Sequence, residues 1–288
     1  MNNALLIILI TLWKTLILLP RAFQLVITNF IGFLIYLISL KRNKYSKANI
    51  ELCFPDKSEA ERKKIYRRNI LLSGRILSDN GIAWFWSDKR IKKNIKYEIN
   101  GLSQLLTEQS SNKGILLFFK HSLHLELDTR ILGMHAEIYG IERKHNSKYF
   151  QSIQKRGRLK SMIDVVDRKN TFKFMKWLKN GKTVLYAPDQ DYGLDKSKVI
   201  KFFGHPAATV SAPYKIIQKT KCKTFFLNSY IKDNKLFLDI EKFNSNNVEE
   251  ISYLNNLNKY IENKIKLNPD EYLWQHRRFK STLRKIYK

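Results

Sequence analysis

The sequence predicts an α/β fold, a mixed central β-sheet flanked by helices, preceded by an amino-terminal membrane-anchor helix. Short apolar runs of β type alternate with stretches of helical periodicity along most of the chain. The first forty residues differ, because they are almost continuously apolar and hold only two charged side chains, Lys14 and Arg21. We therefore expect an anchor of interfacial or spanning helices over residues 1–40 and a single domain over residues 41–288.

The anchor is composed of two apolar runs, residues 1–19 and 23–40, with Pro20-Arg21 between them. About 20 apolar residues span a bilayer and shorter segments lie at its interface, so at least one run is long enough to cross. The first run lacks a following small-residue cleavage site, which disfavours a cleaved signal peptide. A basic stretch at residues 41–47 comes next and predicts a cytoplasmic location for the body of the protein.

Residues 58–79 have the pattern of a basic amphipathic helix, which Ser58 and Glu61 would open with capping-box spacing. Beyond this helix, β-type apolar runs alternate with helical stretches, and this alternation predicts the mixed sheet. The expected strands are residues 115–119, 137–141, 183–187, 224–231 and 236–240.

The charge balance favours an anionic partner. Lys and Arg number 53 against 25 Asp and Glu, which gives a formal net charge of +28. Nucleic acid, an anionic membrane, an acidic carrier protein or a phosphorylated substrate would fit, although a lysine-rich genome explains the same numbers. The apolar amino terminus counts against nucleic acid. Residues 273–288 carry six Lys or Arg and no acid, so they form either a phosphate-binding tail or a solvated helix end.

The clearest chemical signal is a histidine at the end of an apolar strand, His121, with the carboxylate of Glu126 five positions later. Two such side chains on one helix would point about 140° apart, so they meet only if His121 lies in the turn before the helix. A carboxylate on one ring nitrogen would fix the tautomer and leave the other nitrogen as a base. The nucleophile would then be a hydroxyl of the substrate. A purely structural histidine is the alternative.

A metal site is the other alternative for this segment. His121, His124 and Glu126 have the spacing H-x-x-H-x-E, which differs from the H-E-x-x-H of zinc peptidases. No further cluster completes a ligand set, and Cys53 and Cys222 lie far apart in sequence. We therefore expect no metal, and we expect His124 to be structural.

Three more segments suit a substrate-binding site. Asp189 and Asp191 follow an apolar strand in the loop A-P-D-Q-D-Y-G, which otherwise reads as a simple turn. Arg168, with Arg143 upstream, has the chemistry to hold phosphate, although a surface salt-bridge network is an equal alternative. Arg277 lies in W-Q-H-R-R-F-K, where basic and aromatic residues interleave as they do at membrane interfaces or on nucleic acid.

Together these segments resemble the lipid A biosynthesis acyltransferase family, the late acyltransferases of lipopolysaccharide synthesis, and most of all its lauroyl-transferring members. The resemblance extends from the anchor to Lys280. It rests on six ordered segments: NIELCFPDKSEAER at 49–62, AWFW at 83–86, HSLHLE at 121–126, DRKN at 167–170, YAPDQDYG at 186–193 and YLWQHRRFK at 272–280.

The resemblance implies a glycerolipid-acyltransferase-like fold at the bacterial inner membrane, with the catalytic domain on the cytoplasmic face. It implies acyl carrier protein as the donor and the 3-hydroxyl of a hydroxyacyl chain on the Kdo-bearing lipid A precursor as the acceptor. Membrane lipids would be partners, and neither a cofactor nor nucleic acid would be needed. His121 and Glu126 match the family's catalytic HX4(D/E) pair, Arg168 a phosphate or oxyanion contact, and Asp189 and Asp191 a block near the acceptor.

Other functions remain open at this stage. A lysophospholipid or glycerolipid acyltransferase shares the HX4D chemistry but not the APDQDYG and WxHRRFK segments. A non-catalytic basic membrane protein would retain its function after His121→Ala. A family member that has lost its activity would show the same motifs.

Overall fold

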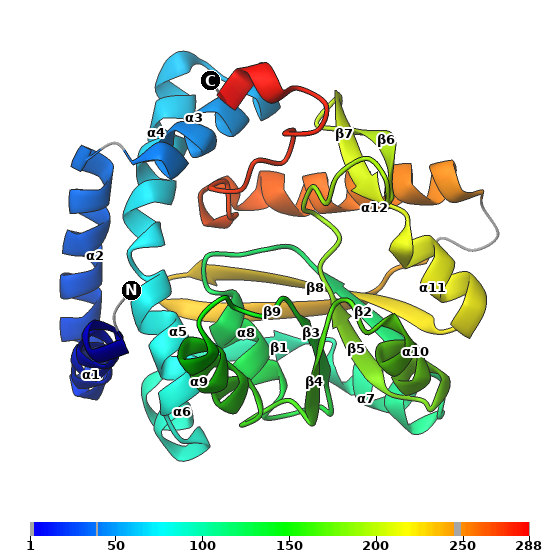
Figure 1. Ribbon diagram of the computed structural model, residues 1–288, viewed down its shortest axis with the longest axis horizontal. Coiled ribbons are helices and arrows are strands. Elements are labelled where there is room, and N and C mark those ends of the chain that lie inside the picture. Colours follow the sequence, from blue (N-terminus) through cyan, green and yellow to red (C-terminus); the bar gives the residue numbers. More distant parts are fainter. Residues whose placement is uncertain (1–2, 39, 245–248, 288) are drawn as a thin grey trace.

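The computed structural model describes residues 3–38, 40–244 and 249–287. Within these residues a seven-stranded sheet has the order β1-β9-β8-β2-β5-β3-β4, and β6 and β7 form a separate two-stranded sheet (Figure 1). The strands are β1 (Tyr97–Asn100), β2 (Ile115–Phe119), β3 (Tyr139–Glu142), β4 (Asp164–Asp167), β5 (Thr183–Tyr186), β6 (Ser197–Phe202), β7 (His205–Val210), β8 (Lys223–Lys232) and β9 (Lys235–Lys242). The predicted α/β class is confirmed.

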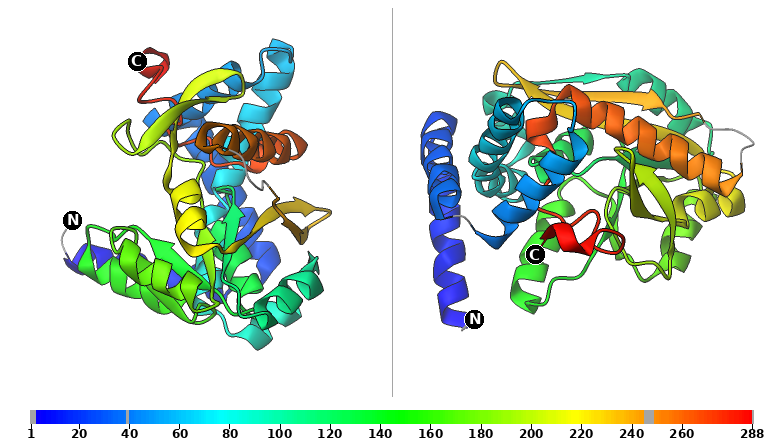
Figure 2. Two further views of the ribbon diagram at one scale, coloured as in Figure 1. Left: turned by 90° about the vertical axis from the view of Figure 1, so that its right-hand side faces the viewer. Right: turned by 90° about the horizontal axis from the view of Figure 1, so that it is seen from above.

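Helices lie on both faces of the large sheet, and two further helices form one edge of the molecule (Figures 1 and 2). The helices are α1 (Asn3–Leu18), α2 (Arg21–Ile38), α3 (Lys41–Cys53), α4 (Glu59–Ser73), α5 (Ile76–Phe85), α6 (Asp88–Asn94), α7 (Leu102–Ser110), α8 (Leu125–Leu132), α9 (Lys148–Arg158), α10 (Thr171–Lys179), α11 (Ala212–Thr220) and α12 (Glu250–Leu267). Two short 3₁₀ helices follow near the carboxyl end, η1 (Pro269–Glu271) and η2 (Arg284–Tyr287).

Strand β2 is the centre of the fold, since side chains on both of its faces are buried. Leu116 and Phe118 pack toward α10, α11 and α12, whereas Ile115 and Leu117 pack toward α5, α7 and α8. Strands with two buried faces are typical of parallel sheets covered by helices. Its neighbours β5 and β8 both run parallel to it. The end of β2 therefore meets the ends of its neighbours at one edge of the sheet.

The sheet is mixed because β8 and β9 form an antiparallel hairpin. Asp233 and Asn234, the two turn residues, both have positive φ, as a tight two-residue hairpin turn requires. Strand β1 then pairs in parallel with β9, so β1 and β9 run opposite to the other five strands.

Most of the predicted elements have the predicted residues. The expected strands at 115–119, 183–187, 224–231 and 236–240 correspond to β2, β5, β8 and β9, whereas the strand expected at 137–141 begins two residues later, as β3. Strands β1, β4, β6 and β7 were not expected. The capping box of Ser58 and Glu61 is confirmed, with both of its hydrogen bonds formed.

The single helix expected over residues 58–79 is wrong. The structure has two helices there, α4 and α5, which meet at Gly74-Arg75. Gly74 is a poor helix residue, and a Cβ on it would lie 2.0 Å from the carbonyl oxygen of Thr28 in α2. The helix expected here is therefore interrupted at Gly74, where the chain packs closely against α2.

The two predicted apolar runs form α1 and α2 over their described residues, while Met1, Asn2 and Ser39 lie outside them. Helix α2 is long and apolar enough to cross a membrane, judged by length and composition. At the other end of the chain, η2 packs on α3, where the rings of Tyr287 and Tyr45 lie 5.5 Å apart. The predicted basic tail is thus folded against the body, and its last residue, Lys288, lies outside the described part.

Candidate active site

Two of the sequence motifs meet at the carboxyl edge of the sheet. His121 follows β2, and Asp189 follows β5, the strand hydrogen-bonded to β2 in parallel. Parallel neighbouring strands end at the same edge, which is where α/β proteins place their sites. The turn after β2 and the loop after β5 therefore bring the imidazole and the carboxylate together.

Asp189 holds His121 by two hydrogen bonds. The Nδ1 atom of His121 lies 2.6 Å from Oδ1 of Asp189, and the His121 backbone N–H donates to Oδ2 at 2.9 Å. A carboxylate only accepts, so Nδ1 carries a proton in this contact. In the neutral ring Nε2 is then the lone-pair nitrogen, and it has no hydrogen-bond partner among the described residues.

The Asp189 carboxylate is fully buried, yet it stays ionised. Burial alone would raise its pKa, but the charge of His121 and the hydrogen bonds from it outweigh burial and lower the pKa of Asp189 to about 2. The Tyr272 hydroxyl donates to the carbonyl oxygen of Asp189 at 3.4 Å. Asp189 is thus a permanent negative charge that orients the ring and stabilises an imidazolium.

The predicted hydrogen bond between Glu126 and His121 is wrong. Glu126 does lie in the first turn of α8, as expected, but its carboxylate pairs with Arg158 of α9 and accepts a 2.8 Å hydrogen bond from Nε1 of Trp84. Arg158 also donates to Glu142, at the end of β3, at 2.8 Å. The arginine on α9 attracts Glu126 away from the ring, and Asp189 occupies the ring nitrogen.

Arg158 lies between two acids, the half-buried Glu126 and the buried Glu142. Burial would raise the pKa of Glu126, but the charge and hydrogen bonds of Arg158 outweigh it and leave that pKa below its usual range. Burial would lower the pKa of Arg158, yet Glu126 and Glu142 raise it. Through these two ion pairs, Arg158 of α9 joins α8, which carries Glu126, to the end of β3.

His124 belongs to a second buried network, behind the turn. Its Nδ1 lies 2.6 Å from Asp128 and its Nε2 lies 3.4 Å from Glu271. Asp128 also accepts hydrogen bonds from the hydroxyl groups of Ser122 and Ser229 at 2.7 Å. Burial would lower the pKa of His124, but the two acids raise it to about 10. The structural role expected for His124 fits this charged bridge.

A segment near the carboxyl end closes over the turn. Ser122 forms a β-bridge with Tyr272, the Leu123 N–H donates to the Glu271 carbonyl at 2.9 Å, and the Leu273 N–H donates to the His121 carbonyl at 2.9 Å. These contacts fix the backbone from the carbonyl of His121 to Leu123. The turn that holds the imidazole is therefore supported by chain from 150 residues later in the sequence.

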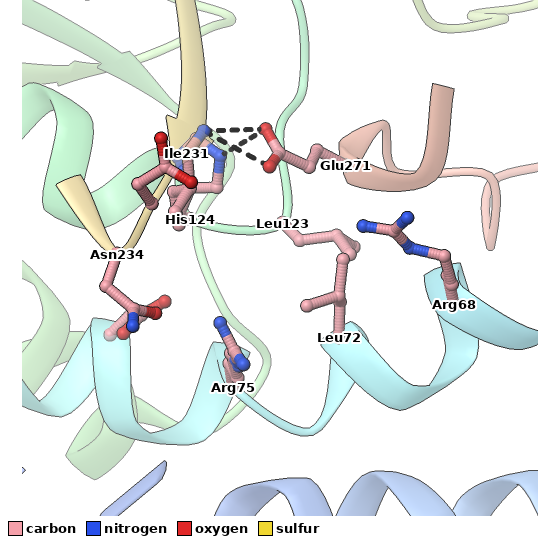
Figure 3. Close-up of a pocket in the computed structure, with 10 residues that line it drawn as sticks. Arg68, Leu72, Arg75, Leu123, His124, Ile231, Asn234 and Glu271 are labelled. Carbon is pink, nitrogen blue, oxygen red and sulfur yellow. Dashed lines mark hydrogen bonds and ion pairs between the residues drawn. The ribbon is translucent and has the colours of Figure 1, made fainter. Parts of the chain in front are cut away.

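A cavity of about 260 Å³ lies on the α4 side of this turn (Figure 3). Guanidinium groups of α4 and the α4–α5 junction line it together with apolar side chains and the His124–Glu271 pair. In the described residues, the Arg75 side chain makes one hydrogen bond, from Nε to the side-chain oxygen of Asn29 in α2 at 2.9 Å. The residues that line the cavity include Arg68, Leu72, Arg75, Leu123, His124 and Glu271.

Asp191 is a buried anchor of its loop. Its carboxylate accepts from the Ser281 backbone N–H at 2.9 Å and hydroxyl at 2.8 Å, and from the Gly193 N–H at 2.9 Å. Its own N–H donates to Nε2 of His276 at 3.1 Å. Burial lowers the pKa of His276 to about 4, with His121 and Arg278 adding to the shift. The carboxylates of both Asp189 and Asp191 are thus occupied by the protein itself, which fits positioning better than direct substrate contact.

The three candidate arginines lie at the surface. Arg168 follows β4 and its guanidinium lies 5.3 Å from the ring of Tyr192, in the loop after β5. Arg143 is exposed just after β3, the neighbouring strand. Arg277 is exposed near the carboxyl end, over the ring of Tyr45. Arg143 and Arg168 therefore share the carboxyl edge of the sheet with His121, whereas Arg277 contacts Tyr45 of α3.

Sequence reasoning missed the Asp189–His121 pair and the role of Arg158. A signal for the first was present, since both segments were expected at strand ends. It needed the additional knowledge that β2 and β5 are neighbours. Arg158 lies in a helix without a motif of its own, and nothing local distinguishes it from the other basic residues of α9.

Comparison with known proteins decides the family. The profile of the family described as bacterial lipid A biosynthesis acyltransferase matches residues 2–281. The chain belongs to this family. Acyl transfer in lipid A biosynthesis is the activity of this chain.

Several lipid A acyltransferases are similar over most of their length. The lauroyltransferase of Escherichia coli K12 is 34% identical over 247 residues, which cover 84% of this chain and 80% of that protein. The palmitoleoyltransferase of the same strain is 32% identical over 248 residues, which cover 84% and 79%. An acyltransferase from Haemophilus influenzae Rd is 31% identical over 287 residues, which cover 94% and 89%. These identities are too close together to assign an acyl chain.

A solved 1-acyl-sn-glycerophosphate acyltransferase from Thermotoga maritima is 16% identical, with 86% of this chain and 95% of that chain covered and a TM-score of 0.36. So slight a likeness carries no argument for the glycerolipid alternative. The lipid A precursor is the substrate that the family implies.

Proposed function

We propose that this lipid A acyltransferase takes its acyl chain, a lauroyl group, from acyl carrier protein and places it on the 3-hydroxyl of a hydroxyacyl chain of the Kdo-bearing precursor. The observation that carries the mechanism is the 2.6 Å contact between Nδ1 of His121 and Asp189, which leaves Nε2 free as a base. Its place at the carboxyl edge of the sheet suits a site that receives two substrates.

The reaction needs no covalent enzyme intermediate. Nε2 of His121 removes the proton of the acceptor hydroxyl as its oxygen attacks the thioester carbonyl carbon. The tetrahedral intermediate collapses with cleavage of the C–S bond, and the imidazolium returns the proton to the leaving thiolate. Asp189 stabilises the imidazolium while it exists, as the aspartate of a catalytic triad does.

In this mechanism Glu126 acts through Arg158. The carboxylate is held by the guanidinium and by Trp84, so its contribution is to fix the position of Arg158 and of α9. Arg168 is the candidate for a phosphate or oxyanion contact, with Arg143 beside it, because both are exposed at the edge where His121 lies. Arg277 would contact substrate only from the α3 side.

The donor and the location follow from charge and from the anchor. A net charge of +28 suits an acidic carrier protein and the phosphates of the precursor. The exposed apolar helices at the amino terminus suit a membrane, with the catalytic domain on the cytoplasmic side, where the basic residues 41–47 begin the body.

The test is transfer of labelled lauroyl from acyl carrier protein to the precursor by the purified, full-length chain in lipid. We expect native activity, and a loss of about 10²-fold to 10⁴-fold in His121→Ala. His135→Ala is the matched control, because His135 bonds to Tyr97 beyond the far end of α8. This control should retain native activity.

Other acceptors and donors complete the test. Transfer to lysophosphatidic acid in preference to the precursor would overturn the acceptor assignment. Equal transfer by the native chain and His121→Ala would overturn the assigned base. A panel of acyl lengths on the carrier decides whether lauroyl or another chain is preferred.

A further inference from the structure

Exposed apolar side chains are concentrated at the amino terminus. Of the twenty-six large hydrophobic residues exposed in the described part of the chain, sixteen lie between residues 5 and 40. They are Leu5, Ile7, Ile8, Leu9, Leu12, Leu18, Leu19, Phe23, Val26, Ile27, Phe30, Phe33, Leu34, Leu37, Ile38 and Leu40. Patches of this size mark a surface that another apolar phase covers.

The exposed residues of α2 form one face of that helix. Phe23, Phe30 and Leu37 are seven residues apart, which is close to two helical turns, and all three are more than half exposed. The opposite face holds Gln24, Thr28 and Gly32, all buried. The two faces of α2 therefore contact different surroundings, one apolar and open, the other polar and packed.

The buried face is fixed to the body along the whole helix. Arg21 pairs with Asp79 at 2.6 Å at the first turn, and the ring of Tyr36 lies 5.9 Å from that of Tyr66 near the last turn. Between these ends the backbones nearly touch, since a Cβ on Gly32 would lie 2.1 Å from the Leu71 carbonyl oxygen. Helix α2 thus runs beside α4 in the opposite direction (Figure 1).

Helix α4 is strongly charged and cannot enter hydrocarbon at low cost. Seven of its fifteen residues are Asp, Glu, Lys or Arg, and Arg67 and Arg68, which lie beside Tyr66, are exposed. If α2 crossed the bilayer, these arginines and Arg75 would lie at membrane depth beside it. Any bilayer that surrounds α2 would have to surround α4 as well.

Helices α1 and α2 lie on the same side of the molecule but run in different directions. Helix α1 lies crosswise to α2, and both form one side of the molecule, with the body on the other (Figures 1 and 2). Helix α1 buries Leu6, Ile10 and Ile17 against the body, and it exposes Leu5, Ile7, Ile8, Leu9, Leu12 and Leu18. At 1.5 Å per residue, its 16 residues extend about 24 Å, less than a bilayer core of about 30 Å.

The charges around this surface match an anionic leaflet. Residues 1–50 contain six Lys or Arg and no Asp or Glu. Lys41, Arg42 and Lys44 lie in the first turn of α3, soon after α2, and all three are exposed. From there they would reach lipid phosphates. Apolar side chains flanked by basic ones are typical of helices that lie in the plane of an interface.

We propose that α1 and α2 attach the protein to a single leaflet of an anionic bilayer, with both helices in the plane of the membrane, and that neither helix crosses it. The exposed face of α2 enters the acyl region, its other face stays on α4, and the active site stays on the same side of the membrane as the amino terminus.

Spin labels at Phe23→Cys, Phe30→Cys and Leu37→Cys test this in full-length protein bound to vesicles that contain phosphatidylglycerol. The native cysteines Cys53 and Cys222 are buried, so they do not compete for the label. The three sites extend about 21 Å along the helix axis. Their depths in the bilayer, measured by oxygen and nickel accessibility, should be equal and should lie within about 10 Å of the interface.

A spanning helix would give a different profile, with Phe30→Cys deepest and the other two sites shallow on opposite sides, and this result would overturn the proposal. Labels shielded from both relaxation agents would also overturn it, since a second copy of the chain would then cover the face. Replacing Lys41, Arg42 and Lys44 by Gln should weaken binding to these vesicles by roughly fivefold per charge. Binding to zwitterionic vesicles should change little.

Discussion

At the scale of single residues, the candidate active site depends on which carboxylate contacts which basic side chain. Asp189 is buried and Glu126 is half-buried near the turn after β2, and they have different partners, the imidazole of His121 and Arg158. The sequence placed His121 and Glu126 correctly, in a turn and in the first helical turn after it. It did not show the pairing, because the choice between two acids depends on α9 and β5, which lie 30 to 70 residues away.

Glu126→Gln should lower the free energy of unfolding by about 1 to 3 kcal/mol, because it removes one of the two acids that pair with the half-buried Arg158. Arg158 would keep Glu142, which limits the loss. Urea unfolding of the protein in detergent measures this. Glu137→Gln is the control, since Glu137 is exposed and lies 3.9 Å from Lys182. Equal losses in both variants would contradict a structural role for the Arg158 pair.

His124 makes stability depend on pH. Its pKa in the folded protein is raised to about 10 by Asp128 and Glu271, against about 6.5 for an unperturbed histidine. A raised folded pKa contributes stability that is complete below about pH 6.5 and is lost as pH rises toward 10. We expect the melting temperature to fall between pH 7 and pH 9, and to fall less in His124→Gln. Parallel curves for both proteins would show that another group titrates.

At the scale of secondary-structure elements, the sequence predicts a strand where its residues are continuously apolar. Strands β2, β5 and β8 were predictable for this reason, because both of their faces are buried. Strand β4 has acids at both ends of its four residues, and β6 exposes half of its residues, so neither strand has that signal. The break between α4 and α5 was not predictable, since it depends on the contact with α2.

The contact between α2 and α4 has little room for side chains. Gly32→Ala should lower the free energy of unfolding by about 1 to 3 kcal/mol, because the new Cβ would meet the Leu71 carbonyl. Alanine is the better helix former, so a loss would come from the contact and not from α2 itself. Phe30→Ala, on the open face of the same helix, should cost much less in detergent. Thermal unfolding of both variants tests this, and a stabilised Gly32→Ala would show that α2 does not pack on α4.

At the scale of the whole molecule, charge and membrane attachment act together. In the proposed function, the excess of Lys and Arg gives a field that draws in anionic partners, and the apolar edge brings the protein to lipid. The basic charge and the apolar amino terminus behind this proposal can both be read from the sequence. The sequence did not predict that α2 packs on a charged helix, and the proposed attachment to one leaflet rests on this packing.

The basic charge of the protein predicts that the reaction with an acyl carrier protein donor depends on salt concentration. The kcat/KM for an acyl carrier protein thioester should fall steeply between about 50 and 300 mM salt, because screening weakens long-range attraction between the basic enzyme and the acidic carrier. A short neutral thioester of the same acyl group serves as the control, and its kcat/KM should change little. Equal salt effects on both donors would place the charge effect on the acceptor or the membrane.

The central claim is that Asp189, and not Glu126, orients the catalytic imidazole. The most direct measurement is the single-turnover rate of acyl transfer by Asp189→Asn in lipid, at saturating donor and acceptor. We predict a loss of about 10³-fold to 10⁴-fold, because an amide at this position would hold the ring in the wrong tautomer. A rate within threefold of the native enzyme would contradict the claim and return the orienting role to another group.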